Sequence, residues 1–201
     1  MIKGIELGSD ISSFPALVFI GDIGGGKKVY RMGGGNTKIG DADIETIMYG
    51  FYKDRLEDMQ IHFCSFSNFA KLKEKLFQLC GAGRQPIPFA ETYHWYGRKF
   101  SCCLTYNREA EKGVIGYTFL PIYWERREDM KLGMVNSWLA LLEETERAVI
   151  TLRFGFNGRD ALTVESTAEC LGLSPEEVRQ IEGDAVKKLQ KISLKEDDVA
   201  I

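Results

Sequence analysis

Long uninterrupted apolar runs are missing from this 201-residue chain, and none reaches the roughly 18 residues that a membrane-spanning helix requires. The opening residues 1–6 include Glu6 and lack an apolar stretch, so the sequence does not predict a secretory signal peptide. The five cysteines form an odd number without the regular spacing of a disulfide framework, which favours reduced thiols. These absences together predict a cytoplasmic location.

Metal ligands at close, paired spacing are also lacking, although six residues could in principle be proposed: His62, Cys64, Cys80, His94, Cys102 and Cys103. Only the first two stand near each other, and neighbouring residues of a strand point to opposite faces, which separates Cys102 from Cys103. No local feature marks an activated thiol for nucleophilic catalysis. We therefore predict no metal, no cofactor and no catalytic residues, and hence no enzyme.

A strong excess of one charge is absent as well, since the formal net charge is −3. Residues 131–201 hold nine Lys and Arg against thirteen Asp and Glu, whereas residues 1–130 hold seventeen against sixteen. The chain is thus no polycation that would hold nucleic acid by bulk charge. Its hydrophobic fraction of 44% and charged fraction of 27% are those of an ordinary globular protein with one large or two small domains.

Strand patterns separated by glycine turns dominate residues 1–129, while two segments, 41–59 and 67–80, show apolar residues at helical spacing. Pro121 would restrict the last strand to an edge or a bulge. We expect an α+β domain with a mainly antiparallel sheet and two helices. The expected strands are a hairpin within 16–32, then 60–65, 92–96, 99–107 and 113–124.

Twenty of the 23 aromatic residues precede residue 131. Because tyrosine and phenylalanine favour strands, we interpret most of them as the core of the sheet. Two alternatives stay open, since aromatics interleaved with arginine near Arg98 could stack on single-stranded nucleic acid or form a partner-binding face.

The segment Gly21–Lys28 nearly fits the phosphate-loop pattern G-x-x-x-x-G-K-[ST]. Lys28 replaces the hydroxyl residue that would hold Mg²⁺, and residues 29–32 read as a strand although a phosphate loop should open a helix. We interpret the segment as a hairpin tip and keep nucleotide binding as a second alternative function.

The clearest signals lie in residues 143–192. Thr163 is a good N-cap for a helix that ends near Gly172, and Ser174, Pro175 and Glu177 have the spacing of a capping box that starts the next helix. Two helices joined by a short glycine-containing turn predict a helix-turn-helix. The second helix carries an apolar stripe formed by Val178, Ile181, Ala185, Leu189 and Ile192.

The opposite face of that helix carries Glu176, Arg179 and Gln180, followed by Gly183 and Lys187. Arginine can grip guanine bidentately, glutamine can do the same to adenine, and glutamate can accept from cytosine. These side chains stand in the first two turns, the part of a recognition helix that meets base edges.

Residues 146–191 resemble region four of the sigma-70 family, the module that reads the promoter −35 element. The resemblance is carried by LRFG at Leu152–Gly155, by T163-V-E with Leu171-Gly172, and by VRQIE at Val178–Glu182. It implies base-reading roles for Glu176, Arg179 and Gln180. It also implies DNA phosphate contacts for Arg153, Thr163, Lys187 and Lys188.

Departures from that family lower the expected affinity for DNA. Pro175, Glu177 and Asp184 stand where basic residues are common in the family. Residues 176–191 hold four basic and four acidic side chains, a balance of zero. Since phosphate neutralisation supplies most non-specific affinity, we expect weak binding by the isolated helix.

The sequence thus predicts an α+β domain at 1–129, a connecting helix at 130–142, an all-α helix-turn-helix domain at 143–195 and an acidic tail at 196–201. The first functional hypothesis is a bacterial transcription regulator that binds double-stranded DNA, with RNA polymerase as a possible partner and a possible homodimer through the first domain. The alternative is an adaptor that mimics region four on RNA polymerase without a specific DNA site.

Overall fold

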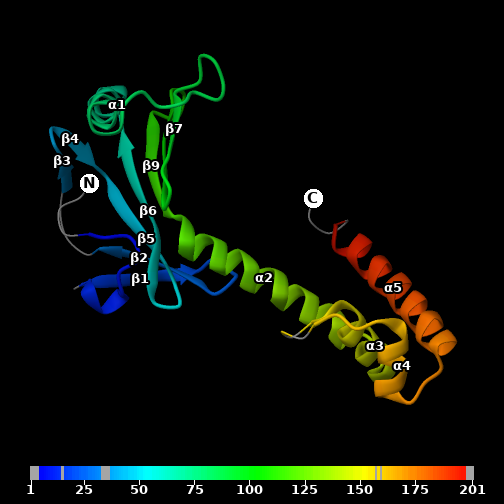
Figure 1. Ribbon diagram of the computed structural model, residues 1–201. Helices are drawn as coiled ribbons and strands as arrows, with labels where there is room; N and C mark the ends of the chain where they lie inside the picture. The colour runs from blue at the N-terminus through cyan, green and yellow to red at the C-terminus, as the bar shows by residue number, and fades with distance from the viewer. Residues whose placement is uncertain (1–4, 15, 33–36, 157, 159, 198–201) are drawn as a thin grey trace. The chain divides into compact units, whose positions relative to one another are not determined.

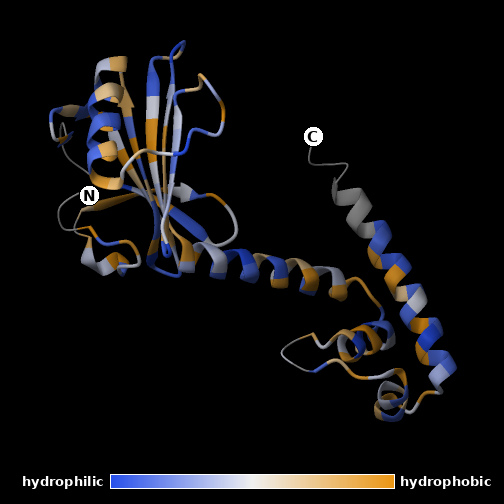
Figure 2. Cartoon of the chain, turned by 45° about the horizontal axis from the view of Figure 1, so that its top comes forward, coloured by the Kyte–Doolittle hydropathy of each residue, from blue (hydrophilic) through white to orange (hydrophobic). Residues whose placement is uncertain are grey.

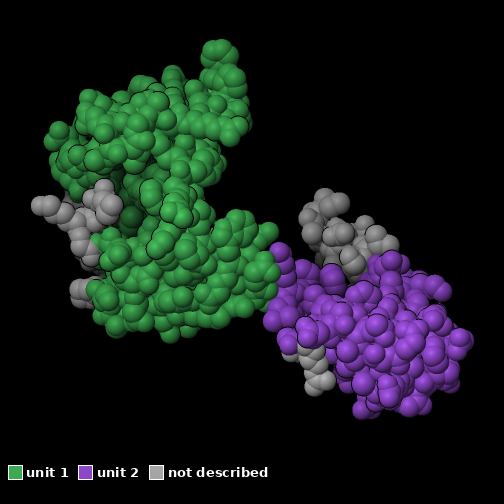
Figure 3. Space-filling model, viewed as in Figure 1, with its two compact units in different colours: residues 1–129 green, residues 130–201 purple. Residues whose placement is uncertain are grey.

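The computed structural model describes residues 5–14, 16–32, 37–156, 158 and 160–197. The chain divides into two compact units, Met1–Asp129 and Met130–Ile201 (Figure 3). The first is a sheet unit and the second a helical unit, which confirms the coarse prediction of an antiparallel sheet followed by helices.

The sheet unit is built on seven strands in the order β1-β2-β5-β6-β9-β8-β7, and each neighbouring pair is antiparallel (Figure 1). A separate two-stranded pair, β3 with β4, and the short 3-10 turn Ile11–Ser13 complete it. The strands are β1 (Leu17–Asp22), β2 (Lys27–Met32), β3 (Thr37–Ile39), β4 (Ala42–Ile44), β5 (Thr46–Tyr52), β6 (Arg55–Cys64), β7 (Thr92–Tyr96), β8 (Phe100–Asn107) and β9 (Lys112–Phe119).

Helix α1 (Phe66–Cys80) packs on one face of this sheet (Figure 1), as its amphipathic pattern predicts. Ser65 caps its start, because the Ser65 Oγ accepts from the Asn68 N–H at 3.3 Å, and Gly81 ends it with a φ of 77°. The buried side of α1 meets aromatic and aliphatic residues of the strands, and Phe69 stacks on Tyr106 with 5.1 Å between ring centroids. The interpretation of the aromatics as sheet core is therefore confirmed.

The helix expected over 41–59 is wrong: this stretch forms β4, β5 and the start of β6. Ile47, Tyr49 and Phe51 alternate as buried residues of β5, so a period of two describes the burial better than the helical period. Lys53 and Asp54 make the two-residue turn to β6 with φ values of 48° and 58°. Such turns usually contain Asn or Gly, and the absence of that signal hid the hairpin from sequence reasoning.

The strand expected over 113–124 ends at Phe119, and the expected restriction of Pro121 to a strand edge or bulge is also wrong. Pro121 lies in the first turn of α2 (Leu120–Ala140), where proline is tolerated because the N–H that it lacks would have no helical acceptor. Helix α2 thus begins ten residues before the expected start of the connecting helix at 130.

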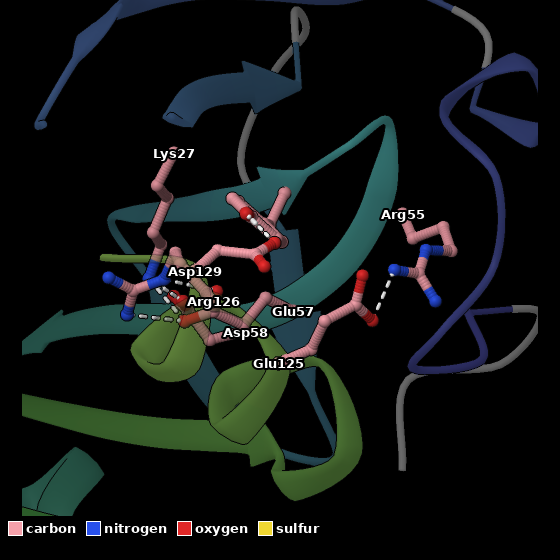
Figure 4. Close-up of polar contacts among 8 residues, drawn as sticks. Lys27, Arg55, Glu57, Asp58, Glu125, Arg126 and Asp129 are labelled. Atoms are coloured by element: carbon pink, nitrogen blue, oxygen red, sulfur yellow. Dashed lines mark hydrogen bonds and ion pairs between the residues drawn. The ribbon is translucent and has the colours of Figure 1, made fainter. Parts of the chain in front are cut away.

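The first turns of α2 are fastened to the sheet unit by charged side chains (Figure 4). Arg126 donates from Nε and Nη2 to the two carboxylate oxygens of Glu57, at 2.6 and 2.9 Å. Lys27 contacts both Glu57 and Asp58, and its burial lowers the pKa of its ammonium group. Gly50 leaves the room for this cluster, since a Cβ there would lie 2.5 Å from the Lys27 Cε.

The helical unit contains the remainder of α2, then α3 (Glu144–Phe154), α4 (Val164–Leu171) and α5 (Pro175–Asp197). Hydrophilic and hydrophobic residues alternate around α5 (Figure 2), which fits a helix with one buried stripe. Side chains beyond residue 191, including Ile192 of the expected stripe, lie outside the description, as does the expected acidic tail from Asp198 onward.

Candidate nucleic-acid interface

Local capping defines α4, the turn and the start of α5. The Thr163 Oγ1 accepts from the Ser166 N–H at 3.1 Å, and Gly172 ends α4 with a φ of 67°. The Glu177 Oε2 accepts from the Ser174 N–H at 2.7 Å, while the Ser174 Oγ accepts from the Glu177 N–H at 3.2 Å. The capping box is confirmed, and the Ser174 N–H together with the hydroxyl lowers the pKa of Glu177.

Two apolar clusters hold the inner face of α5. Val178 packs with Val149 of α3 and Ala168 of α4, and all three are buried. Ala185 packs with Ile150 of α3 and Leu139 of α2. The apolar stripe is therefore confirmed at its described positions, and the polar face of α5 is turned away from this core.

The proposed base readers, Glu176, Arg179 and Gln180, are all exposed on the first two turns of α5. Arg179, whose side chain is 54% exposed, lies 3.3 Å from the Glu176 Oε1 and 3.4 Å from the Glu165 Oε1 of α4. Ion pairs this exposed contribute little, so they hold the guanidinium loosely. The arrangement leaves three hydrogen-bonding side chains on one open face.

Two of the proposed phosphate contacts, Lys187 and Lys188, also have acidic neighbours. The Lys187 Nζ lies 3.5 Å from the Asp184 Oδ1, an ion pair at the distance limit of a hydrogen bond. The Lys188 Nζ lies 2.6 Å from the Glu146 Oε1 of α3, a pair that raises the pKa of Lys188 and lowers that of Glu146. Lys188 is therefore held more firmly inside the helical unit than Lys187.

Arg153 has the most enclosed position of the proposed phosphate contacts. Its Nε donates to the Glu182 Oε2 of α5 at 2.7 Å, and its Nη1 donates to the carbonyl oxygen of Leu162. About a fifth of each side chain in the Arg153–Glu182 pair is exposed. Arg153 thus joins α3, α5 and the residue before the Thr163 cap, which gives it a structural role inside the helical unit.

Residues 138–191 match the family model for sigma-70, region 4. The chain is 41% identical over 58 residues to RNA polymerase sigma factor RpoS of Coxiella burnetii, covering 29% of this chain and 16% of that protein. It is 37% identical over 59 residues to RNA polymerase sigma factor SigA4 of Synechococcus elongatus, covering 29% and 19%. It is 43% identical over 65 residues to RNA polymerase sigma factor RpoD of Helicobacter pylori, covering 32% and 10%.

These findings confirm the resemblance of the C-terminal part to sigma-70 region 4. The chain spans less than a fifth of the length of each of these relatives. No solved structure matches the chain.

Sequence reasoning missed the acidic partners of three basic residues. Arg179 pairs with Glu165, Lys188 with Glu146, and Arg153 with Glu182. Each lies 14 to 42 residues from its partner in the sequence, so no local spacing rule connects the pair. The zero net charge of residues 176–191 was the only signal that such acidic partners exist, and a net charge does not say which residues pair.

Gly183 lies in α5, within the region 4 match. Substituting it tests whether the outward face of α5 comes close to a DNA backbone. The change Gly183→Ala is expected to raise the unfolding free energy of the helical unit by about 1 kcal/mol. A Cβ at this position would meet no atom within 4 Å, so the native structure accommodates it. Urea unfolding measures the gain, and a loss of stability would contradict the prediction. A fall in DNA affinity in a stabilised variant would indicate close approach of the DNA at this position.

The Gly21–Lys28 segment does not have the geometry of a phosphate loop. It forms the tip between β1 and β2, with positive φ at Gly24, Gly25 and Gly26. A strand follows it, and Lys27 is buried against Glu57 and Asp58. Its ammonium group therefore does not face a site that a nucleotide could reach, and the hairpin interpretation holds.

Two further findings concern the described part of the chain. It contains no group of three or more His, Cys, Asp or Glu arranged to hold a metal ion. None of its helices combines the length and the apolarity that crossing a bilayer demands.

Proposed function

We propose that this protein is a transcription regulator whose helical unit reads double-stranded DNA with α5 of a helix-turn-helix. Glu176, Arg179 and Gln180 would contact base edges in the major groove. Lys187 and Thr163 would contact phosphates, and Lys188 would do so after exchanging Glu146 for a phosphate, whereas Arg153 would stay paired with Glu182. The observation that carries the proposal is the exposed trio on the first two turns of α5, within the region 4 match.

The electrostatics of α5 favour selective over strong binding. Residues 176–191 have no net charge, and each proposed phosphate-binding Lys or Arg has a carboxylate nearby. Binding would therefore release few counterions, and the affinity for DNA would fall only gradually as the salt concentration rises. Residues 1–129 and 130–201 would act as separate domains in a cytoplasmic protein, with the helical domain completed by RNA polymerase at a promoter.

The change Arg179→Ala is expected to remove about 1–3 kcal/mol of discrimination between a −35-like duplex and a scrambled duplex, because a bidentate contact to a base edge is lost. Fluorescence anisotropy at two salt concentrations measures both affinities. Arg147→Ala is the matched control, since Arg147 is an exposed arginine of α3 outside the trio. Equal affinity of the wild type for the two duplexes would overturn the DNA-reading proposal.

A second function, an adaptor that binds RNA polymerase without reading DNA, is favoured by an apolar groove in the helical unit. The groove has a volume of about 350 Å³ and is lined by Val135, Trp138, Leu139, Ile150, Phe154, Phe156, Val186, Leu189 and Gln190. Phe154 is half exposed at its rim. A groove of this kind suits the apolar face of a protein helix. Capture of polymerase that Phe154→Glu abolishes, in a protein indifferent to DNA sequence, would favour the adaptor.

A further inference from the structure

Strand β1 leaves a row of large apolar side chains in water at one end of the sheet. Val18, Phe19 and Ile20 are consecutive and between 46% and 56% exposed, so apolar groups stand on both faces of the strand. Ile23, which follows β1, and Met32, at the far end of β2, extend the patch. Among the described residues, none pairs with the outer side of β1.

The opposite edge of the sheet, strand β7, is partly covered by a neighbouring loop. Outside β7, the Arg84 N–H donates to the His94 carbonyl at 2.8 Å, and the His94 N–H donates to the Arg84 carbonyl at 2.8 Å. A loop thus occupies the backbone groups at the centre of that edge, which is one of the ways proteins block unwanted strand pairing. Within the part of the chain that the structure describes, no loop pairs with β1 over Leu17–Gly21, and this stretch contains neither lysine nor proline.

We propose that β1 is the edge through which two copies of this protein pair, with β1 antiparallel to β1 of the second copy across a two-fold axis. The two seven-stranded sheets would then continue into each other through backbone hydrogen bonds. The apolar side chains of Val18, Phe19 and Ile20 would be covered by their own counterparts.

The charge pattern of β1 suits a second copy of itself. In a two-fold antiparallel pair, residues near the centre of the strand face the same residues of the partner, so a central charge would face a like charge. The centre of β1 is uncharged, and Asp22 at one end would lie across from the opposite end of the second strand. Strand length is matched by symmetry, and six residues give an interface about 20 Å long.

The irregularity in β1 is compatible with this pairing. The register between β1 and β2 shifts between Phe19 and Gly21, so Ile20 has no residue opposite it on β2. Its side chain, 48% exposed, is therefore free of the β2 register. The bulge adds local twist, which limits the pairing to a short stretch and predicts a dimer that dissociates on dilution.

The choice of a second copy rests on the proposed function in one respect. A single α5 without net charge offers few DNA contacts, whereas a symmetric dimer brings two recognition helices into one assembly. The pairing itself is measurable without DNA, so the two proposals fail separately.

Sedimentation equilibrium of the full chain tests the proposal. The wild type is expected to rise with concentration from the monomer mass of 22.7 kDa toward twice that value. Ile20→Lys is expected to stay monomeric, because two ammonium groups would lie close to each other beside the two-fold axis, among apolar side chains. Ile87→Lys is the matched control: Ile87 is 62% exposed in the loop before β7, and its variant should dimerise like the wild type.

Hydrogen exchange on the wild type is the second measurement, and it stands even if Ile20→Lys does not fold. Amides of residues 17–22 should become protected as concentration rises, while those of β7 should not change. A wild type that is monomeric throughout, or a dimer whose β1 amides exchange at the same rate at every concentration, overturns the proposal. If Ile20→Lys is monomeric and still prefers the −35-like duplex, the DNA-reading proposal holds. If the protein dimerises through β1 but binds all DNA sequences equally, the DNA-reading proposal fails and the dimer proposal holds.

Discussion

Replacing Glu57 by alanine is expected to lower the unfolding free energy of the sheet unit by about 3–5 kcal/mol, because one buried carboxylate there serves two cations. Glu57 is 1% exposed. It accepts from Arg126 at 2.6 and 2.9 Å and from the Lys27 Nζ at 3.3 Å (Figure 4). The variant would leave Asp58 as the acidic neighbour of Lys27 and would take from Arg126 its bidentate acceptor, so positive charge would stay buried with half its compensation.

The control for this variant is Glu125→Ala, at the residue of α2 that directly precedes Arg126. Glu125 pairs with Lys53 at 3.2 Å and Arg55 at 2.6 Å, but its side chain is 37% exposed and its partners more so. Pairs of that exposure contribute about 0–1 kcal/mol. Urea unfolding measures both variants, and hydrogen exchange of residues 120–129 reports whether α2 loosens. Equal, small losses would contradict the role given to Glu57.

The helical unit could be predicted well because its signals are local. Thr163, Ser174 and Glu177 act on N–H groups within three residues, and Gly172 takes the left-handed conformation that ends helices. The apolar stripe of α5 repeats at the helical period and meets α3 and α4 as expected. A helix cap and an apolar stripe both depend on residues within one or two helical turns, so they can be recognised from a single sequence.

The sheet unit was predicted less completely because its elements depend on distant pairings. Ile44, Ile47 and Phe51 fit a helical period by coincidence. Their strand identity follows from distant partners: Ile44 pairs with Thr37 of β3, and Ile47 and Phe51 pair with residues of β6. Propensity alone does not decide between such periods when tertiary pairing supplies the free energy. The same holds for the start of α2, whose acceptor Glu57 lies 69 residues from Arg126 in sequence.

The candidate interface was predicted in part, and for the same reason. Helical periodicity places Glu176, Arg179 and Gln180 on one face, and the structure has all three exposed. Periodicity is silent about the neighbours that α3 and α4 bring, and those neighbours are carboxylates. Their presence changes the expectation for the cations from open phosphate ligands to groups that must exchange partners.

Among these basic residues, Arg153 is the one whose acidic partner is expected to matter most for stability. Arg153→Ala is expected to lower the unfolding free energy of the helical unit by about 1–3 kcal/mol, since the largely buried Glu182 and the Leu162 carbonyl both lose their donor. Lys187→Ala, at a side chain that is 74% exposed, is expected to change stability by less than about 0.5 kcal/mol. Urea unfolding of the two variants side by side measures this difference.

The salt dependence of DNA binding should show the reverse order, with a larger effect for Lys187→Ala than for Arg153→Ala. A lost phosphate contact lowers the slope of log affinity against log salt by about 1, so Lys187→Ala should flatten that slope. Arg153→Ala should leave the slope unchanged and weaken binding only as far as the Thr163 cap and α5 are loosened. A flattened slope in Arg153→Ala, with stability intact, would show instead that its guanidinium leaves Glu182 for a phosphate. Arg153 would then be a DNA ligand held in reserve by an acidic partner, and the low charge of α5 would understate its affinity for DNA.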